Sequence, residues 1–190
     1  MKSIQVAKGY DLPVQGAPPD KLERPEPPDT VAVLPEHIPF IKPRLAVAEG
    51  DPVALGDVLF AAKHDSRLRF LSPGGGHVAA VHYGPRRVLR EVVIRRQVDD
   101  EPVRDLASPL AAKDLSGCER GDLVDRLLAG GVWPLLRSLP FRAIADPDVV
   151  PPAIFVAVDA REPFRVPPGR YLEHHRVPFE LGLAALKRLC

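Results

Sequence analysis

The glycine-rich segment 72-SPGGGHV-78 holds the residues best suited to cradling a phosphate in this sequence. A P-loop requires such a turn to open a helix and to be followed by Lys and then Ser or Thr. Here the glycines lead into a predicted strand, and His77 stands in place of any lysine. We therefore interpret the segment as a tight β-turn and not as a nucleotide site.

A second candidate is the continuous apolar run 153-AIFVAVDA-160. Such a run is typical of a strand that is covered on both faces in a parallel α/β sheet. A dinucleotide-binding loop, G-x-G-x-x-G, should follow this strand directly. The next residues are instead Arg161-Glu-Pro163, and the first glycine is Gly169. The sequence therefore does not support a conventional NAD or FAD site.

The histidines offer no local metal site. His77 and His82 are five residues apart on a predicted strand, which sends their side chains to opposite faces. His174 and His175 are adjacent and also diverge in an extended segment, while His64 falls in a predicted exposed hairpin loop. Metal ligands must converge, so we predict no metal-ligating residue.

A nucleophile is also missing from the sequence pattern. There is no G-x-S-x-G, and no pair of carboxylates stands out for acid–base chemistry. Cys118 falls at a predicted helix start, where a thiol pKa can be lowered, but we interpret this residue as a packing residue. Trp133 is interpreted as core filling. We predict no catalytic and no cofactor-binding residue in the chain.

Composition limits the classes of partner. The 26 basic and 25 acidic residues balance to a net charge of +1, which argues against nucleic acid as the main partner. Two arginine pairs, Arg86-Arg87 and Arg95-Arg96, are interpreted as solvated strand edges. Only two cysteines occur, too few for a disulfide framework or a structural zinc site. No run approaches the roughly 20 apolar residues of a membrane span, and we expect a cytosolic protein that reaches a membrane through a partner.

The elements that would position any site fall into three parts. Residues 1–98 are predicted to hold N-terminal strands and a compact β-sandwich or barrel, because short apolar runs alternate there with Gly, Pro, Asp and Ser. The predicted strands lie near residues 4–6, 31–35, 45–47, 58–60, 68–70, 78–81 and 88–94. Gly50 and Gly56 are predicted to adopt positive φ in two turns of this part.

Residues 99–145 are predicted to form a helical linker. A capping box at Ser116 and Glu119 precedes a helical pattern that ends at Gly130-Gly131. Pro134 suits the first turn of a second helix, expected over 134–141.

Residues 146–190 are predicted to begin a Rossmann-like α/β unit, with the strand 153–160 and a helix over 179–190. The apolar residues of that helix predict that it packs on another surface.

The spacing of 45-LAVAEGDPVALGDVLF-60 and 71-LSPGGGHVAAVH-82 resembles the barrel-sandwich hybrid of biotinyl and lipoyl carrier domains. Carrier domains of this type place a modifiable lysine about six residues before the proline of the second half. That position is Arg67 here, whose guanidinium cannot form the amide link, and Lys63 comes too early in the hairpin. The resemblance therefore implies the fold without a covalently bound cofactor.

Longer blocks resemble the A subunit of the Na⁺-translocating NADH:quinone oxidoreductase. These blocks are 4-IQVAKGYDLPVQGAP-18, 43-PRLAVAEGDPVALGDVLF-60, 85-PRRVLREVVI-94, 127-LLAGGVWPLLRSLPF-141 and 152-PAIFVAVDAREPF-164. The resemblance implies a cytoplasmic peripheral subunit that has no prosthetic group of its own and docks on the membrane part of a redox-driven sodium pump. It places NADH oxidation and flavin chemistry in other subunits. For the family a role of the A subunit in quinone handling has been proposed, and the sequence does not assign that role to any residue of this chain.

Alternatives to this function remain open at the level of sequence. Family members continue through further domains, so the chain is either a part of a longer protein or a shortened relative. A shortened relative would be a stand-alone adaptor that binds a different membrane or redox complex. An independent enzyme is the third alternative, and no residue constellation favours it.

Overall fold

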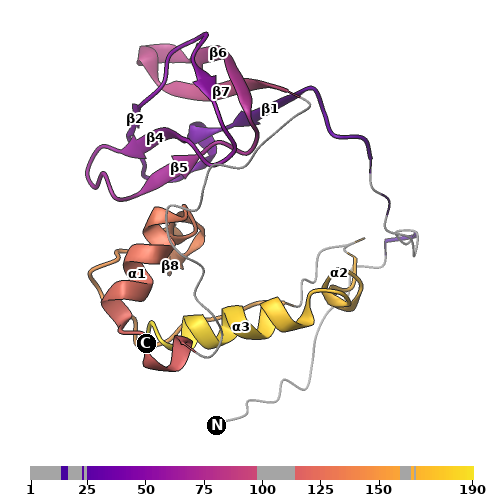
Figure 1. Ribbon diagram of the computed structural model, residues 1–190, viewed down its shortest axis with the longest axis vertical. Coiled ribbons are helices and arrows are strands. Elements are labelled where there is room, and N and C mark those ends of the chain that lie inside the picture. Colours follow the sequence, from indigo (N-terminus) through magenta and orange to yellow (C-terminus); the bar gives the residue numbers. More distant parts are fainter. Residues whose placement is uncertain (1–13, 17–22, 24, 98–113, 159–163, 165) are drawn as a thin grey trace.

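The structure, a computed structural model, describes residues 14–16, 23, 25–97, 114–158, 164 and 166–190. Figure 1 shows two parts, one that holds the strands β1 to β7 and one that holds the helices α1 and α3. The short strand expected near residues 4–6 lies outside the described residues, and the predicted boundaries 1–98, 99–145 and 146–190 stay predictions.

The first part consists of two antiparallel sheets. The four-stranded sheet has the order β1-β7-β6-β3 and comprises β1 (Thr30–Val33), β7 (Leu89–Arg96), β6 (Gly76–Tyr83) and β3 (Pro52–Val53). The three-stranded sheet has the order β2-β4-β5 and comprises β2 (Pro43–Leu45), β4 (Val58–Ala62) and β5 (Arg69–Leu71). A single-turn 3₁₀ helix, η1 (Pro35–His37), and a tight turn, η2 (Pro85–Arg87), whose Arg86 has non-helical backbone angles, complete it. The strands predicted between residues 31 and 94 are confirmed within a few residues.

Two equivalent Gly-Asp turns shape this part. Gly50 and Gly56 have φ of 89° and 95°, the left-handed conformation that was predicted for them. In each turn the next residue, Asp51 or Asp57, accepts a hydrogen bond of 2.7 Å from the amide three positions earlier. Each aspartate therefore closes its own turn, as Asx side chains do.

The first core fills the space between the two sheets. Phe60 is fully buried and stacks on Phe70 with ring centroids 4.7 Å apart. Leu59, its neighbour, is also fully buried, because the pairing register of β4 with β5 shifts between Val58 and Phe60. A bulge of this kind lets two consecutive side chains point into apolar surroundings. The other buried members are Val53, Val78, Leu89, Val92 and Ile94.

The second part contains helices and one small hairpin. Its elements are η3 (Leu115–Gly117), α1 (Arg120–Ala129), η4 (Trp133–Leu135), β8 (Arg137–Ser138), β9 (Ala143–Ile144), α2 (Pro168–Leu172) and α3 (Arg176–Lys187). Its core joins Leu123, Val124, Leu128, Trp133 and Leu189 to Ala62 and Leu68 of the β4–β5 hairpin. The two parts are therefore continuous through that hairpin.

The first predicted helix of the linker is confirmed as α1, which ends at Gly130. The capping box is wrong. The N-cap of α1 is Glu119, with no side-chain capping bond, and Ser116 lies one turn earlier inside η3. The helix begins three residues too late for the Ser116 hydroxyl to reach its free amides.

The second predicted helix, 134–141, is also wrong. Only one 3₁₀ turn forms, and Arg137 and Ser138 then pair with Ile144 and Ala143 in the β8–β9 hairpin. Pro140, inside the predicted helix, has no N–H for a helical ladder and would clash with the preceding turn. The hairpin satisfies backbone groups that a helix would leave unpaired there.

The strand predicted over 153–160 is not formed by its described residues, 153–158. None of the three sheets in the described residues includes this segment, so it has no neighbour to receive its backbone hydrogen bonds. Its apolar side chains stay largely uncovered, and Phe155 is 82% exposed. The apolar pattern is thus present without the pairing that defines a strand.

The predicted C-terminal helix is confirmed as α3, which begins three residues earlier than expected. Its second half packs on the second core through Leu181, Ala185 and Leu186, as predicted. Arg188 donates a 2.9 Å hydrogen bond to the carbonyl of Cys118 and so ties the end of α3 to the start of α1. Among the described residues, no helix has the length and apolar character needed to cross a membrane.

Replacing Phe60 with alanine tests the first core. We expect Phe60→Ala to lower the free energy of unfolding by about 3–5 kcal/mol, because a buried aromatic ring is lost and a cavity remains. Val177, which is 77% exposed on α3, supplies the control. Val177→Ala should change stability by less than about 0.5 kcal/mol. Urea unfolding followed by circular dichroism measures both, and similar midpoints for the two variants would contradict this description of the core.

Candidate functional site

Arg67 lies in the β4–β5 hairpin, at the position where the resemblance to carrier domains led us to look for a lysine. Its backbone N–H and its Nε both donate to Oδ1 of Asp65, at 2.9 and 3.0 Å. Its Nη2 donates to Oδ2 of the same carboxylate at 2.8 Å. Asp65 therefore fixes both the loop backbone and the direction of the arginine side chain.

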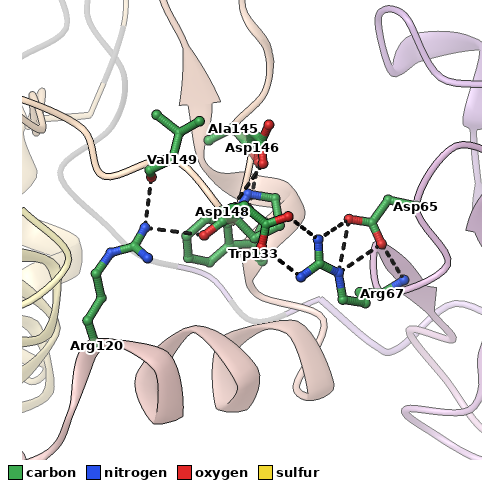
Figure 2. A network of polar contacts seen from close by, with 9 residues as sticks. Asp65, Arg67, Arg120, Trp133, Ala145, Asp146, Asp148 and Val149 are labelled. Carbon is green, nitrogen blue, oxygen red and sulfur yellow. Dashed lines mark hydrogen bonds and ion pairs between the residues drawn. The ribbon is translucent and has the colours of Figure 1, made fainter.

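The same guanidinium also binds a residue 81 positions away in the sequence. Nη1 and Nη2 donate to Oδ1 and Oδ2 of Asp148 at 2.9 and 2.8 Å, a bidentate pair. Figure 2 shows the Arg67 guanidinium between the two carboxylates. We name Asp65, Arg67 and Asp148 the Arg67 junction, because they join the β-rich part to the helical part.

The loop that carries Asp148 is held from two sides. Trp133, buried in the second core, donates from Nε1 to the carbonyl of Ala145 at 2.8 Å. Arg120 donates from Nη2 to the carbonyl of Val149 at 2.7 Å. Asp146 accepts the amide of Asp148 at 2.9 Å and closes the turn between them. Asp148 thus meets Arg67 from a preorganised loop (Figure 2).

The β-rich part and the helical part also make apolar contacts with each other. Gly131, directly after α1, has φ of +66°, and a Cβ added there would lie 2.6 Å from Cδ1 of Leu71 in β5. The positive φ favours glycine at this position, and a larger residue would also require the Leu71 side chain to move. With Ala62 and Leu68 in the second core, the contact makes the junction one edge of a packed interface.

The hydrogen-bonded ion pairs of the Arg67 junction shift the pKa values of its three side chains. Hydrogen bonds from Arg67 hold the pKa of the Asp148 carboxyl below its ordinary value. The pKa of Asp65 is lowered for the same main reason, and the pKa of Arg67 is raised by Asp148 first and Asp65 second. Both carboxylates are therefore ionised at neutral pH, so the junction offers neither a general acid nor a free nucleophile. Its chemistry is positioning.

The histidines considered as metal ligands do not form a cluster in the structure. His82 Nδ1 lies 2.5 Å from Oε1 of Glu91 on the neighbouring strand, while His77 lies opposite Arg95 in the β6–β7 register. Across the part of the chain that the structure describes, no three His, Cys, Asp or Glu residues are grouped as metal ligands would be.

The other candidates have structural roles. Cys118 is a buried member of the second core, as predicted, and so is Trp133. In the glycine-rich turn, a Cβ at Gly76 would lie 2.0 Å from the carbonyl oxygen of Arg95. Gly74 similarly faces the Arg96 side chain at 3.2 Å. Because these glycines have no side chains, the turn can lie close to β7.

Sequence reasoning identified the position of Arg67 but missed its partner. The segment Asp146-Pro-Asp148 does carry a turn signal, since Asp followed by Pro favours a turn. Nothing in the sequence links that turn to a hairpin 81 residues earlier.

Comparison with protein families matches almost the whole chain. Residues 4–97 match the NqrA N-terminal barrel-sandwich hybrid domain. Residues 118–190 match the NqrA second alpha/beta domain. The two matches confirm the predicted fold class, a barrel-sandwich hybrid followed by an α/β segment.

Curated relatives agree with the family match. The chain is 36% identical over 186 residues to the A subunit of the Na(+)-translocating NADH-quinone reductase of Pseudomonas aeruginosa PAO1. It is 37% identical over 187 residues to the protein of the same name in Klebsiella pneumoniae strain 342. Each alignment covers 98% of this chain and 41% of the relative. The chain thus spans about two fifths of the length of these relatives.

The pH dependence of stability tests the Arg67 junction. Because the folded-state pKa values of Asp65 and Asp148 are lowered, their contribution is present above the unfolded-state values and is lost as pH falls through the folded-state values. Arg67→Met should therefore be less stable than the parent chain at pH 7, and the difference should shrink between about pH 5 and pH 3.

Urea midpoints across this pH range measure the effect. Arg44→Met, at an exposed position of β2, removes the same charge and is the control. Arg67→Lys keeps the charge without the bidentate geometry and should fall between the parent and Arg67→Met. A stability difference that does not change with pH, or that Arg44→Met reproduces, would contradict the described role of the junction.

Proposed function

We propose, because this chain belongs to the NqrA family, that it acts as a non-catalytic peripheral subunit, or part of one, of a Na⁺-translocating NADH-quinone reductase-type complex. In this proposal the chain provides docking and assembly surface, and other subunits carry it to the membrane. NADH oxidation and flavin chemistry belong to those subunits.

The observation that carries the proposal is the use of Arg67. A carrier domain needs a free primary amine at the hairpin tip, and this chain has a guanidinium there. Its hydrogen-bonding groups are directed to Asp65 and Asp148, at 2.8 to 3.1 Å. The hairpin that would present a cofactor instead attaches the barrel to the second part. Such an arrangement favours a rigid scaffold over a mobile group carrier.

The same reasoning extends to catalysis. The ionisable side chains that the structure brings together are joined in ion pairs, such as Arg67 with Asp148 and Arg90 with Glu36. Catalytic groups usually stand in a cleft with a pKa shifted toward the working pH, and the shifts at the Arg67 junction move both carboxylates away from it. We therefore propose no catalytic residue, no metal ligand and no covalently bound cofactor in this chain.

Co-purification tests the proposed function. A tagged copy of the chain, produced in a host with the other subunits of such a reductase, should retain flavin-containing membrane subunits and NADH-quinone reductase activity. Phe60→Ala should lose them, since the barrel is destabilised, and Val177→Ala should keep them. Retention of an unrelated membrane or redox complex would instead establish the stand-alone adaptor. Retention of neither would contradict both functions.

A further inference from the structure

The turn of the β6–β7 hairpin carries two adjacent arginines in an uncommon backbone conformation. Arg86 and Arg87 have φ of 58° and 56°, in the left-handed region. The Gly84 amide donates to the carbonyl of Val88 at 2.7 Å and closes the hairpin. Two central residues with positive φ match the type I′ turn, which strongly prefers Asn-Gly. Arginine at both positions is therefore unfavourable for the turn itself, and such strain concentrates at functional sites.

Both arginine side chains are exposed to solvent. Within the described residues, neither guanidinium has a hydrogen-bond or ion-pair partner. Tyr83 and Val88, which flank the turn, are each 52% exposed. We name these four residues the arginine tip. It combines two exposed guanidinium groups with a half-exposed aromatic ring and an apolar side chain.

The charges beside the tip are already paired. Arg90 donates from Nε to Glu36 at 3.1 Å, and His82 lies against Glu91. These four residues line a surface pocket together with Val81 and Tyr83. The lining of this pocket holds the carboxylates of Glu36 and Glu91, and Arg86 and Arg87 carry exposed positive charge at the adjoining end of the hairpin.

We propose that the arginine tip docks on an acidic segment of a partner protein. Guanidinium groups bind carboxylates bidentately, and Arg and Tyr are among the side chains most enriched at the anchors of protein interfaces. The pocket beside the tip gives such a segment a concave surface for a side chain. The inference rests on the proposed subunit role, which requires a surface for a partner, and it adds where that surface lies and what chemistry it takes.

An anionic membrane is the alternative partner. The small number of basic residues at the arginine tip argues against membrane binding. Lipid recognition by basic residues takes clusters of about four to eight Lys or Arg. The tip provides two, Arg86 and Arg87. Two guanidinium groups are enough to pair with carboxylates in a protein interface but are weak as a membrane anchor.

Fluorescence anisotropy with the full chain tests the proposal. The probe is a fluorescein-labelled decapeptide of alternating Glu and Ala, and its Gln-for-Glu counterpart is the neutral control. The parent chain should bind the Glu peptide, more weakly at about 200 mM than at about 50 mM NaCl. Arg86→Gln/Arg87→Gln should weaken binding by about tenfold or more. Arg44→Gln/Arg137→Gln, which removes two exposed arginines elsewhere, should weaken it less than about twofold.

A second variant separates docking from folding. Arg86→Asn/Arg87→Gly supplies the residues that a type I′ turn prefers, so it should keep or raise the unfolding temperature while it loses peptide binding. The proposal is overturned if the parent chain does not bind the Glu peptide, or if both Gln double variants weaken binding equally. It is also overturned if vesicles of phosphatidylcholine with phosphatidylserine are bound through the tip and the peptide is not.

The subunit role is assessed separately by co-purification of the same variants. If the parent chain and Arg86→Gln/Arg87→Gln retain the reductase subunits equally, the arginine tip is not the docking site and the subunit role stands. If the parent chain retains none while the tip still binds the Glu peptide, the subunit role fails and the acidic-segment site stands.

Discussion

The β4–β5 hairpin has to fill two cores at once, and the arrangement of the whole chain depends on this constraint. Phe60 belongs to the core between the two sheets, whereas Ala62 and Leu68 belong to the core built on α1 and Trp133. Protein interiors are packed too densely to tolerate voids. The hairpin therefore cannot shift toward one part without opening a cavity in the other. The Arg67 junction lies at the edge of this shared packing, where exposed charges stabilise little by themselves but set the direction of the contact.

What the sequence predicted well depends on local chemistry. Gly50 and Gly56 mark turns because the required positive φ is a property of one residue, and the adjoining aspartates close those turns within three positions. The helix α1 follows from its apolar spacing in the same way. Apart from the local capping box at Ser116 and Glu119, what failed depended on pairing. The segment 134–141 became a hairpin because Ala143 and Ile144 were available as partners, and 153–158 lacks the neighbouring strand that its apolar pattern anticipates.

The Arg67 junction shows the same difference between local and long-range contacts. Asp65 and Arg67 are close in sequence, and the resemblance to carrier domains singled out position 67. Asp148 could not be predicted, since it is 81 positions from Arg67 and meets it only through the tertiary fold. Trp133 was predicted as a core residue, and its indole N–H turned out to hold the loop of Asp148 through Ala145. Buried tryptophans usually find such a partner, so the bond was foreseeable and its acceptor was not.

The tip of the β4–β5 hairpin carries an arginine that is engaged by two carboxylates. A carrier hairpin must leave its terminal amine free to move between sites. Arg67 occupies the corresponding position with a planar group that matches two carboxylates, and Asp65 and Asp148 supply them from the same hairpin and from the second part. In this chain the β4–β5 hairpin is attached to the second part through Arg67 and Asp148. The shared core and the Arg67–Asp148 pair both act on this hairpin, so the position of the barrel relative to α1 depends on apolar packing and on one charged contact together.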